Sequence, residues 1–214
     1  MVAEIYSPPR VTNCAKLLPC YKVIPGFALD LTTKNSRGEA WDFDDPAKRE
    51  EAMQLVLKEQ PMLLVLSPMC TAFSRWQSLN AHKRSKELVE QEWKKAMVHF
   101  NFACELMKVQ LRAGRYFLYE HPLAASSWSQ LCVQEVMRHP DVTWVCGDQC
   151  QYGQQGGGDD PVKKPTKWMS NSRGSQGLRA ALRRPRRSVL GGRTPSLGFR
   201  RPSQSRGHLH ISAV

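Results

Sequence analysis

A cysteine and a glutamate each follow an apolar segment that has the pattern of a buried strand. Residues 62–66 form an apolar run that ends at Ser67-Pro68, since proline cannot continue a central strand, and Cys70 comes two residues later. Open α/β sheets place ligands and chemistry just outside the carboxyl ends of their strands. We therefore interpret Cys70 as a candidate nucleophile, with an inert buried thiol as the alternative. Glu120 ends a second such segment, 116–120, and its alternative role is an ion-paired or helix-capping carboxylate.

The segment around the cysteine resembles the catalytic loop of the DNA cytosine-5 methyltransferases. In that family a strand runs into a loop similar to Ser-Pro-Pro-Cys-Gln-x-Phe-Ser, and the cysteine attacks the target base. Residues 67–74 match most of this loop, with Met69 in place of the second proline and Thr71 in place of the glutamine. Residues 116–122 look like the family's Glu-Asn-Val strand end, whose glutamate contacts the cytosine ring. The resemblance covers roughly residues 2–172 and implies that Cys70 and Glu120 are catalytic.

The resemblance also implies S-adenosylmethionine as the cofactor. Residues 3–7 resemble the family's first strand, Asp30 resembles the acidic residue that holds the ribose, and residues 41–43 resemble the next cofactor-contacting segment. Asp30 has an alternative role in a turn before Thr32-Thr33, and two neighbouring aspartates, Asp44 and Asp45, compete with Asp42. The implied cofactor-binding residues are Tyr6, Ser7, Asp30, Asp42, Ser67 and Pro68.

The chain departs from the family after its first strand. Family members carry glycines there, which allow the backbone to approach the cofactor closely, whereas this chain has Ser7-Pro8-Pro9-Arg10. Two prolines remove amide donors and stiffen the turn. If this loop excludes the cofactor, the alternative is a catalytically silent relative, such as a mobile-element remnant, that binds nucleic acid non-specifically. The family's large target-recognition region has no obvious counterpart, while residues 148–153 and 164–168 look like the closing hairpin of divergent members.

The reaction of this family requires a thiol and a carboxyl group together. Cytosine C5 is a poor nucleophile, so a thiolate adds to C6 and raises the electron density at C5 for attack on a methyl donor. A carboxyl group near N3 stabilises the developing charge, and the base must first leave the duplex. We therefore expect methyl transfer to DNA cytosine, with Cys70 and Glu120 in these roles. A cysteine-dependent hydrolase is a weaker alternative, because no histidine follows a strand where it would obviously serve as the base.

Apolar patterning predicts alternating strands and helices. Asp45-Pro46 is a helix start signal, and apolar spacings of three and four over 86–112 predict a long amphipathic helix. A third helix is expected over about 126–138. The alternation favours an α/β fold with a mostly parallel, doubly wound sheet, which the resemblance implies to be of the class I methyltransferase type. The predicted strands are 2–6, 27–31, 62–67, 116–120, 142–146 and 166–169.

Basic charge is concentrated at the end of the chain. The sequence has 31 Lys and Arg against 19 Asp and Glu, a net charge of +12, yet residues 1–172 are near +2 and residues 173–214 hold 10 arginines and no acid. Because Arg, Gly, Ser and Pro dominate this tail, we predict an α/β domain over 1–172 and a disordered basic tail over 173–214. Such a tail suits non-specific binding to nucleic acid phosphates. The alternative is an unselected extension, from a shifted reading frame or a gene-model artefact.

Cysteine usage and hydropathy indicate the compartment. The 7 cysteines are odd in number and irregularly spaced, which favours a reduced intracellular protein, nuclear if the organism is eukaryotic. Cys146 and Cys150 lack a second matching pair, so we expect no metal site. No apolar run approaches the ~20 residues that span a bilayer, and no signal pattern is visible at the start. We expect a monomer that binds DNA and no membrane.

Overall fold

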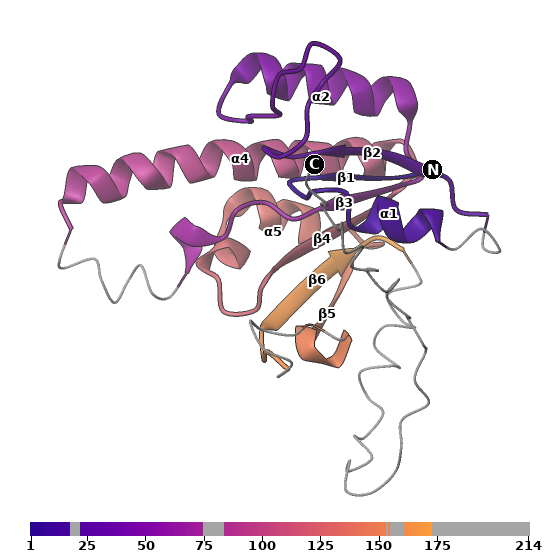
Figure 1. Cartoon of the computed structure of the whole chain (residues 1–214). Helices are drawn as coiled ribbons and strands as arrows, with labels where there is room; N and C mark the ends of the chain where they lie inside the picture. The colour runs from indigo at the N-terminus through magenta and orange to yellow at the C-terminus, as the bar shows by residue number, and fades with distance from the viewer. Residues whose placement is uncertain (18–21, 75–83, 153, 155–160, 173–214) are drawn as a thin grey trace, which may run out of the picture. The chain divides into compact units, whose positions relative to one another are not determined.

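The structure is a computed structural model of the chain, and it describes residues 1–17, 22–74, 84–152, 154 and 161–172 (Figure 1). The chain divides into two units, Met1–Arg183 and Arg184–Val214, and every described residue belongs to the first. The tail that we expected to be disordered, 173–214, lies outside the described residues. Its disorder and the domain boundary at residue 172 therefore stay predictions.

A six-stranded mixed sheet forms the centre of the first unit, with the strand order β2-β1-β3-β4-β6-β5. The pairs β1–β2, β1–β3 and β3–β4 are parallel, and β6 runs antiparallel to both of its neighbours. The prediction of a mostly parallel α/β sheet is therefore confirmed, and each predicted strand is present with its ends within two residues of the prediction. The strands are β1 (Val2–Ile5), β2 (Pro25–Leu29), β3 (Leu63–Leu66), β4 (Tyr116–Pro122), β5 (Thr143–Asp148) and β6 (Pro165–Ser170).

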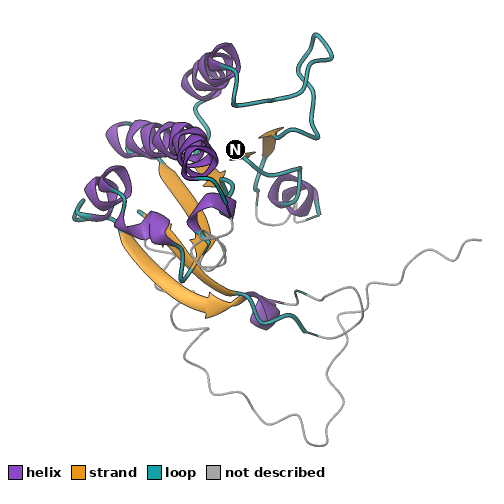
Figure 2. Cartoon of the chain, turned by 90° about the vertical axis from the view of Figure 1, so that its left-hand side faces the viewer, coloured by secondary structure: helices purple, strands orange, loops and turns teal. Residues whose placement is uncertain are grey.

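Helices lie on both faces of the sheet, as Figure 2 shows. Successive side chains of a strand point to opposite faces, so Val2 and Ala3 of β1 belong to different cores. Val2 packs with Ala15 of α1, whereas Ala3 belongs to the larger core, to which α2, α4 and α5 contribute. The helices are α1 (Val11–Lys16), α2 (Pro46–Glu59), α4 (Lys86–Arg112) and α5 (Leu131–Met137), with short 3-10 turns η2 (Thr71–Phe73), η4 (Ser126–Ser129) and η5 (Gln149–Tyr152).

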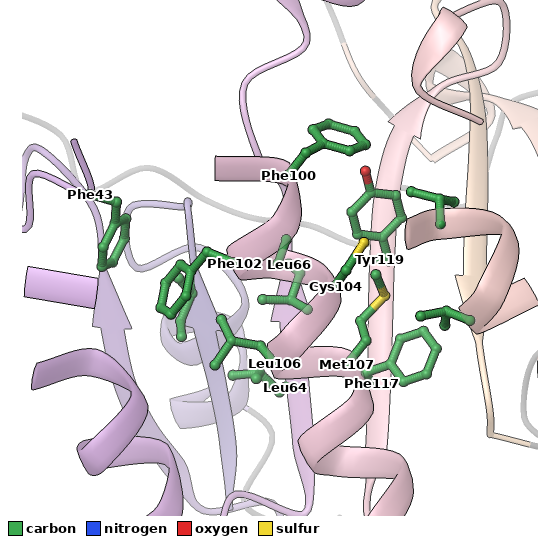
Figure 3. Packing of buried hydrophobic residues seen from close by; sticks show 14 of the residues in the cluster. Phe43, Leu64, Leu66, Phe100, Phe102, Cys104, Leu106, Met107, Phe117 and Tyr119 are labelled. Carbon is green, nitrogen blue, oxygen red and sulfur yellow. The ribbon is translucent and has the colours of Figure 1, made fainter. Parts of the chain in front are cut away.

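The larger core lies between the sheet and α4 (Figure 3). Leu64 and Leu66 of β3 and Phe117 and Tyr119 of β4 are at most 1% exposed there. The inner side of α4 meets them with residues that recur every three or four positions, as an amphipathic helix requires. These α4 residues are Phe100, Ala103, Cys104, Leu106 and Met107.

Helix starts that depend on local capping agree with the sequence predictions. α4 begins at Lys86, where the Ser85 hydroxyl accepts a hydrogen bond from the amide of Leu88 at 3.2 Å. α2 begins at Pro46, and the Asp45 carboxylate accepts from the amide of Ala47 at 2.8 Å. Both caps act within three residues of the helix start, which explains why the sequence alone locates them.

The predicted third helix, 126–138, is interrupted. Gln130 is extended, with φ −70° and ψ 139°, and separates η4 from α5. The indole of Trp128 donates a hydrogen bond to the carbonyl of Pro122 at 2.8 Å and holds η4 against β4. η4 and α5 therefore do not form one continuous helix. The apolar periodicity of the segment gives no sign of this interruption.

α1 was not predicted, because its six residues carry no apolar periodicity. It is held by Glu4 of β1, a carboxylate with 0% exposure. Glu4 accepts hydrogen bonds from the amides of Val11 and Thr12 at 3.2 and 2.9 Å and from the Thr12 hydroxyl at 2.7 Å. Buried charge is tolerated only when such bonds compensate for lost hydration, so Glu4 and the start of α1 form one unit.

Replacing Glu4 with glutamine is expected to lower the free energy of unfolding by about 2–3 kcal/mol, because an amide NH2 would face a backbone N–H in a fully buried site. Urea unfolding followed by circular dichroism measures this change. Glu50→Gln is the matched control, since Glu50 is exposed on α2 and its carboxylate accepts only from the Gln54 side chain among the described residues. Equal stability of the two variants would show that the Glu4 charge is not needed by α1.

Candidate functional site

The strand order reverses between β1 and β3, because β2 lies on one side of β1 and β3 on the other. Ligands of open α/β sheets bind outside the carboxyl ends of the strands at such a switch point. A cavity of about 80 Å³ lies there. Four of the six predicted cofactor-binding residues line it: Tyr6, Asp30, Asp42 and Ser67. The rest of its lining is Leu31, Trp41, Phe43, Asp44, Met69 and His99.

Tyr6 stands directly after β1 in the left-handed region, with φ 64°. Its amide donates to the carbonyl of Leu29 at 2.9 Å, and its ring lies edge-on to Phe43 with the centroids 4.9 Å apart. Burial raises the pKa of the Tyr6 hydroxyl well above its usual value, so the phenol is neutral. A non-glycine residue in this conformation is uncommon and often marks a functional turn.

Asp30, Asp42 and Ser67 reach the cavity from three different segments. Asp30 follows β2, and its Oδ1 accepts from the amide and the hydroxyl of Thr32 at 3.0 and 2.8 Å. Asp42 is exposed, and its Oδ1 accepts from the amide of Asp44 at 3.0 Å. Asp30 thus has both the turn role that we considered and a place at the cavity.

The sequence did not point to His99, whose side chain is 5% exposed. Its Nε2 lies 2.9 Å from Oδ1 of Asp44, and its Nδ1 lies 3.2 Å from the Tyr6 hydroxyl. Burial would raise the pKa of Asp44, but hydrogen bonds to Lys95 and His99 outweigh it and hold that pKa below its usual value. This chain of polar contacts links α4 to the cavity. The helical spacing of apolar residues does not identify His99 as a functional residue, because His99 lies beside the apolar stripe of α4.

The other two predicted cofactor-binding residues, Ser7 and Pro68, are buried and do not belong to the lining of this cavity. The Ser7 hydroxyl donates to the carbonyl of Pro8 at 2.9 Å. The two prolines after it have no amide hydrogen, and the first amides of α1 already bond to Glu4. This turn therefore offers few donors to a ligand.

Cys70 is partly exposed and lies in the loop between β3 and η2. Phe73, 1% exposed, anchors that loop in the core, with its ring 4.3 Å from Phe100 and 5.0 Å from Trp93, centroid to centroid. The amide of Phe73 donates to the carbonyl of Cys70 at 3.1 Å. A buried aromatic three residues away thus fixes the backbone at Cys70.

Glu120 lies on β4 one residue beyond the segment that pairs with β3. Its Oε1 accepts from Nε2 of Gln149 at 3.0 Å and lies 3.9 Å from Nζ of Lys164. Burial raises the pKa of Glu120, and this effect outweighs the opposing effects of Lys164, Gln149 and Arg10. The carboxyl group therefore keeps its proton to a higher pH than an ordinary glutamate does.

Cys70 and Glu120 lie near the carboxyl ends of β3 and β4, which are parallel neighbours over Leu63–Leu66 and Tyr116–Tyr119. Glu120 is still within β4 and pairs with Trp168 of β6. The sequence predicts that the strands 62–67 and 116–120 are neighbours and that Cys70 and Glu120 open into one cleft, and the parallel pairing of β3 with β4 confirms the first of these two predictions. Neither of the two hollows described here is lined by either residue. Their opening into one cleft stays a prediction.

His121 follows Glu120 on the opposite face of β4 and is 1% exposed. Its Nδ1 lies 2.8 Å from the Ser127 hydroxyl, while its Nε2 and the Tyr119 hydroxyl have no hydrogen-bond partner among the described residues. Burial lowers the pKa of His121 to about 4, so its ring is neutral at pH 7. The ring lies 6.0 Å from that of Phe73, which makes His121 part of the support beneath the Cys70 loop.

A second, wider hollow of about 720 Å³ lies beside α2. Four of its charged side chains pair with one another: Lys48 and Arg37 each bond to both Glu39 and Glu51. Hydrogen bonds from Lys48, Asn35 and Arg37 lower the pKa of Glu39 to about 2. This network holds the 34–40 turn on α2 and has a structural role.

No family model matches the chain, and no curated protein matches its sequence. In the part of the chain that the structure describes, no group of three or more His, Cys, Asp or Glu residues could hold a metal ion. None of the described helices is long and apolar enough to cross a membrane.

Proposed function

We propose that the chain is a DNA cytosine-5 methyltransferase-like protein that transfers a methyl group from S-adenosylmethionine to cytosine C5 through a covalent Cys70 adduct. One observation supports this function above the others. Four residues that the family resemblance implied for the cofactor line one cavity at the switch point of the sheet. Cys70 follows β3, and Glu120 lies near the carboxyl end of its neighbour β4.

The sheet itself supports a methyltransferase-type fold. The resemblance implied a closing hairpin, and β5 and β6 form an antiparallel pair there. β6 lies between β4 and β5 and is the strand that reverses the direction of the sheet. Helices on both faces fit the doubly wound arrangement.

The cavity fits the adenosine part of S-adenosylmethionine in its chemistry. Asp30 follows β2, where an acidic side chain can accept hydrogen bonds from two ribose hydroxyls. Trp41 and Phe43 supply apolar walls for a purine ring. The volume of about 80 Å³ is well below the ~300 Å³ of an ordinary ligand site. Cofactor binding therefore requires the cavity to widen, and two of its lining residues, Leu31 and Met69, are 58% and 51% exposed.

The chemistry follows from Cys70 and Glu120. S-adenosylmethionine supplies the electrophilic methyl group when bound. The Cys70 thiolate forms a bond to C6 of a cytosine that has left the duplex, and the displaced electron pair moves toward N3. The Glu120 carboxyl meets that charge with its proton, which its raised pKa helps it to keep. Loss of the C5 proton after methylation breaks the sulfur–C6 bond and frees Cys70.

A catalytically silent relative is the second candidate, and the turn after β1 favours it. Pro8 and Pro9 cannot donate hydrogen bonds, and Glu4 already occupies the first amides of α1. A protein of this kind would keep the sheet and bind nucleic acid non-specifically or not at all.

Cofactor binding separates the two candidates. Calorimetric titration of S-adenosylmethionine into the full chain is expected to show binding, and Asp30→Asn is expected to weaken it about 10- to 100-fold through the loss of charge-assisted hydrogen bonds. Asp141→Asn is the matched control, because Asp141 lies on the surface beyond α5 with its side chain 77% exposed. If the wild type does not bind S-adenosylmethionine, the proposal of an enzyme is wrong and the catalytically silent relative takes its place.

A further inference from the structure

Two donors from the hairpin of β5 and β6 reach the same oxygen of Glu120. Nε2 of Gln149 donates a hydrogen bond to Oε1 of Glu120 at 3.0 Å, and Nζ of Lys164 lies 3.9 Å from that oxygen. Gln149 begins η5 directly after β5, and Lys164 directly precedes β6. Among the described residues, no hydrogen bond or ion pair reaches Oε2 of Glu120. The two oxygens of this carboxyl group therefore have different surroundings.

The backbone of the hairpin holds Gln149 in place. Its amide donates to the carbonyl of Lys164 at 3.1 Å, which continues the pairing of β5 with β6 past Asp148 and Pro165. β6 in turn pairs with β4, the strand that carries Glu120. The contact between Gln149 and Glu120 thus joins residues 29 positions apart through paired strands.

These donors determine which oxygen of the neutral carboxyl group carries the proton. A protonated carboxyl group has one O–H donor, and its other oxygen accepts hydrogen bonds. A proton on Oε1 would point at the N–H groups of Gln149 and at the ammonium group of Lys164, which are donors themselves. The proton of neutral Glu120 therefore lies on Oε2.

We propose that Gln149 is a positioning residue for Glu120, because its amide fixes the rotation of the carboxyl group and keeps the acidic proton on Oε2, the oxygen that donates to the cytosine ring. This inference rests on the proposed function and assigns a further residue to the same site. Gln149 itself forms and breaks no covalent bond. A carboxyl group that rotated freely would direct its proton away from the base for part of the time, which lowers the rate of proton transfer.

The charged groups around Glu120 act on it in a different way. Lys164 and Arg10, which precedes α1, lower the pKa of Glu120, as the Gln149 bond does, against the larger effect of burial. At 3.9 Å the Lys164 ammonium acts through its charge, whereas Gln149 acts through a directed hydrogen bond. A charge changes how readily the proton is lost, and a directed bond also fixes where the proton lies. Replacing the two residues one at a time separates these effects.

Two variants of the full chain, Gln149→Leu and Lys164→Met, test the inference. Each removes one donor, and the backbone bond between the two residues remains in both variants. Titration of isotope-labelled carboxyl groups by NMR, with the Glu120 signal assigned from Glu120→Gln, measures the pKa of Glu120. Both variants should show a higher pKa than the wild type, because each loses a group that favours the charged form.

Single-turnover methyl transfer, measured where Glu120 is protonated in all three proteins, isolates the positioning effect. Gln149→Leu is expected to be about 10-fold slower than the wild type, the usual effect of one hydrogen bond to a reacting group. Lys164→Met is the matched control and should stay within about threefold of the wild type, since an exposed ion pair contributes little. As the pH rises, both variants should keep their rate to a higher pH than the wild type does.

The inference is overturned if Gln149→Leu leaves the pKa of Glu120 unchanged or lowers it. The amide would then make no such bond, or its carbonyl would accept the proton. Equal rates for Gln149→Leu and Lys164→Met at low pH also overturn it, because loss of a donor near Oε1 would then explain both. A wild type that transfers no methyl group overturns the proposed function and with it the catalytic role of Gln149, and the titration distinguishes that result from a missing Gln149 bond.

Discussion

Replacing Cys70 with alanine is expected to abolish the covalent complex with DNA that contains 5-fluorocytosine and to slow methyl transfer by at least about 10³-fold. Fluorine at C5 blocks the elimination that frees the thiol, so the wild type should be trapped and the variant should not. Stability should change by less than about 1 kcal/mol, because Cys70 is partly exposed in a loop and contributes little packing. Denaturing gel electrophoresis of the DNA complex and single-turnover methyl transfer measure the two effects.

Cys14→Ala is the matched control for this series, since it removes an exposed thiol far along the chain from the loop. It should form the adduct as the wild type does. Methyl transfer by Cys70→Ala would exclude the covalent mechanism even if the cofactor binds. If the wild type forms the adduct but does not bind S-adenosylmethionine, the turn after β1 is the part of the protein that prevents methyl transfer.

Glu120→Gln extends the same experiment to the carboxyl group. Loss of a positioned proton donor usually costs about 10²- to 10⁴-fold in rate. Because burial raises the pKa of Glu120, wild-type transfer should fall as the pH rises through that pKa, where the carboxyl loses its proton. The variant has no such group, so its rate should lack this decline. If both proteins show the same pH profile, a group other than Glu120 donates the proton to the cytosine ring.

Phe73→Ala is expected to be among the most destabilising single changes in this unit. The ring is 1% exposed and touches Trp93 and Phe100, and truncating such a side chain typically costs about 3–5 kcal/mol. Because Phe73 anchors the Cys70 loop, the variant should also lose adduct formation under conditions where it is still folded. Urea unfolding and thiol labelling of Cys70 measure the two parts.

Met69→Ala is the control in the same loop, because Met69 is 51% exposed and should leave stability nearly unchanged. Phe73→Leu, which keeps most of the apolar volume, should recover a large part of the loss. If Phe73→Ala cost no more than Met69→Ala, the loop would have to be held by contacts other than this ring.

Local patterns in the sequence were sufficient for the elements that depend on neighbouring residues. Spacings of three and four define α4 from Lys86 to Arg112, and Asp45-Pro46 marks the start of α2. The apolar runs before Ser67 and Glu120 identify β3 and β4, because buried parallel strands need continuous apolar residues.

Contacts between distant residues decided the rest. Glu4 holds the start of α1 through hydrogen bonds to residues seven and eight positions later. The hydrogen bond from Trp128 to Pro122 of β4 interrupts a segment whose periodicity predicts one helix. His99 reaches the cavity through its contact with Asp44, which is 55 residues away in the sequence. Periodicity reports which side of an element is apolar, whereas the partners of a buried polar group depend on which segments the sheet order brings together. The sequence by itself therefore determined the strands and the long helix, while only the tertiary structure brought His99 and Asp44 to the cavity and broke the third helix.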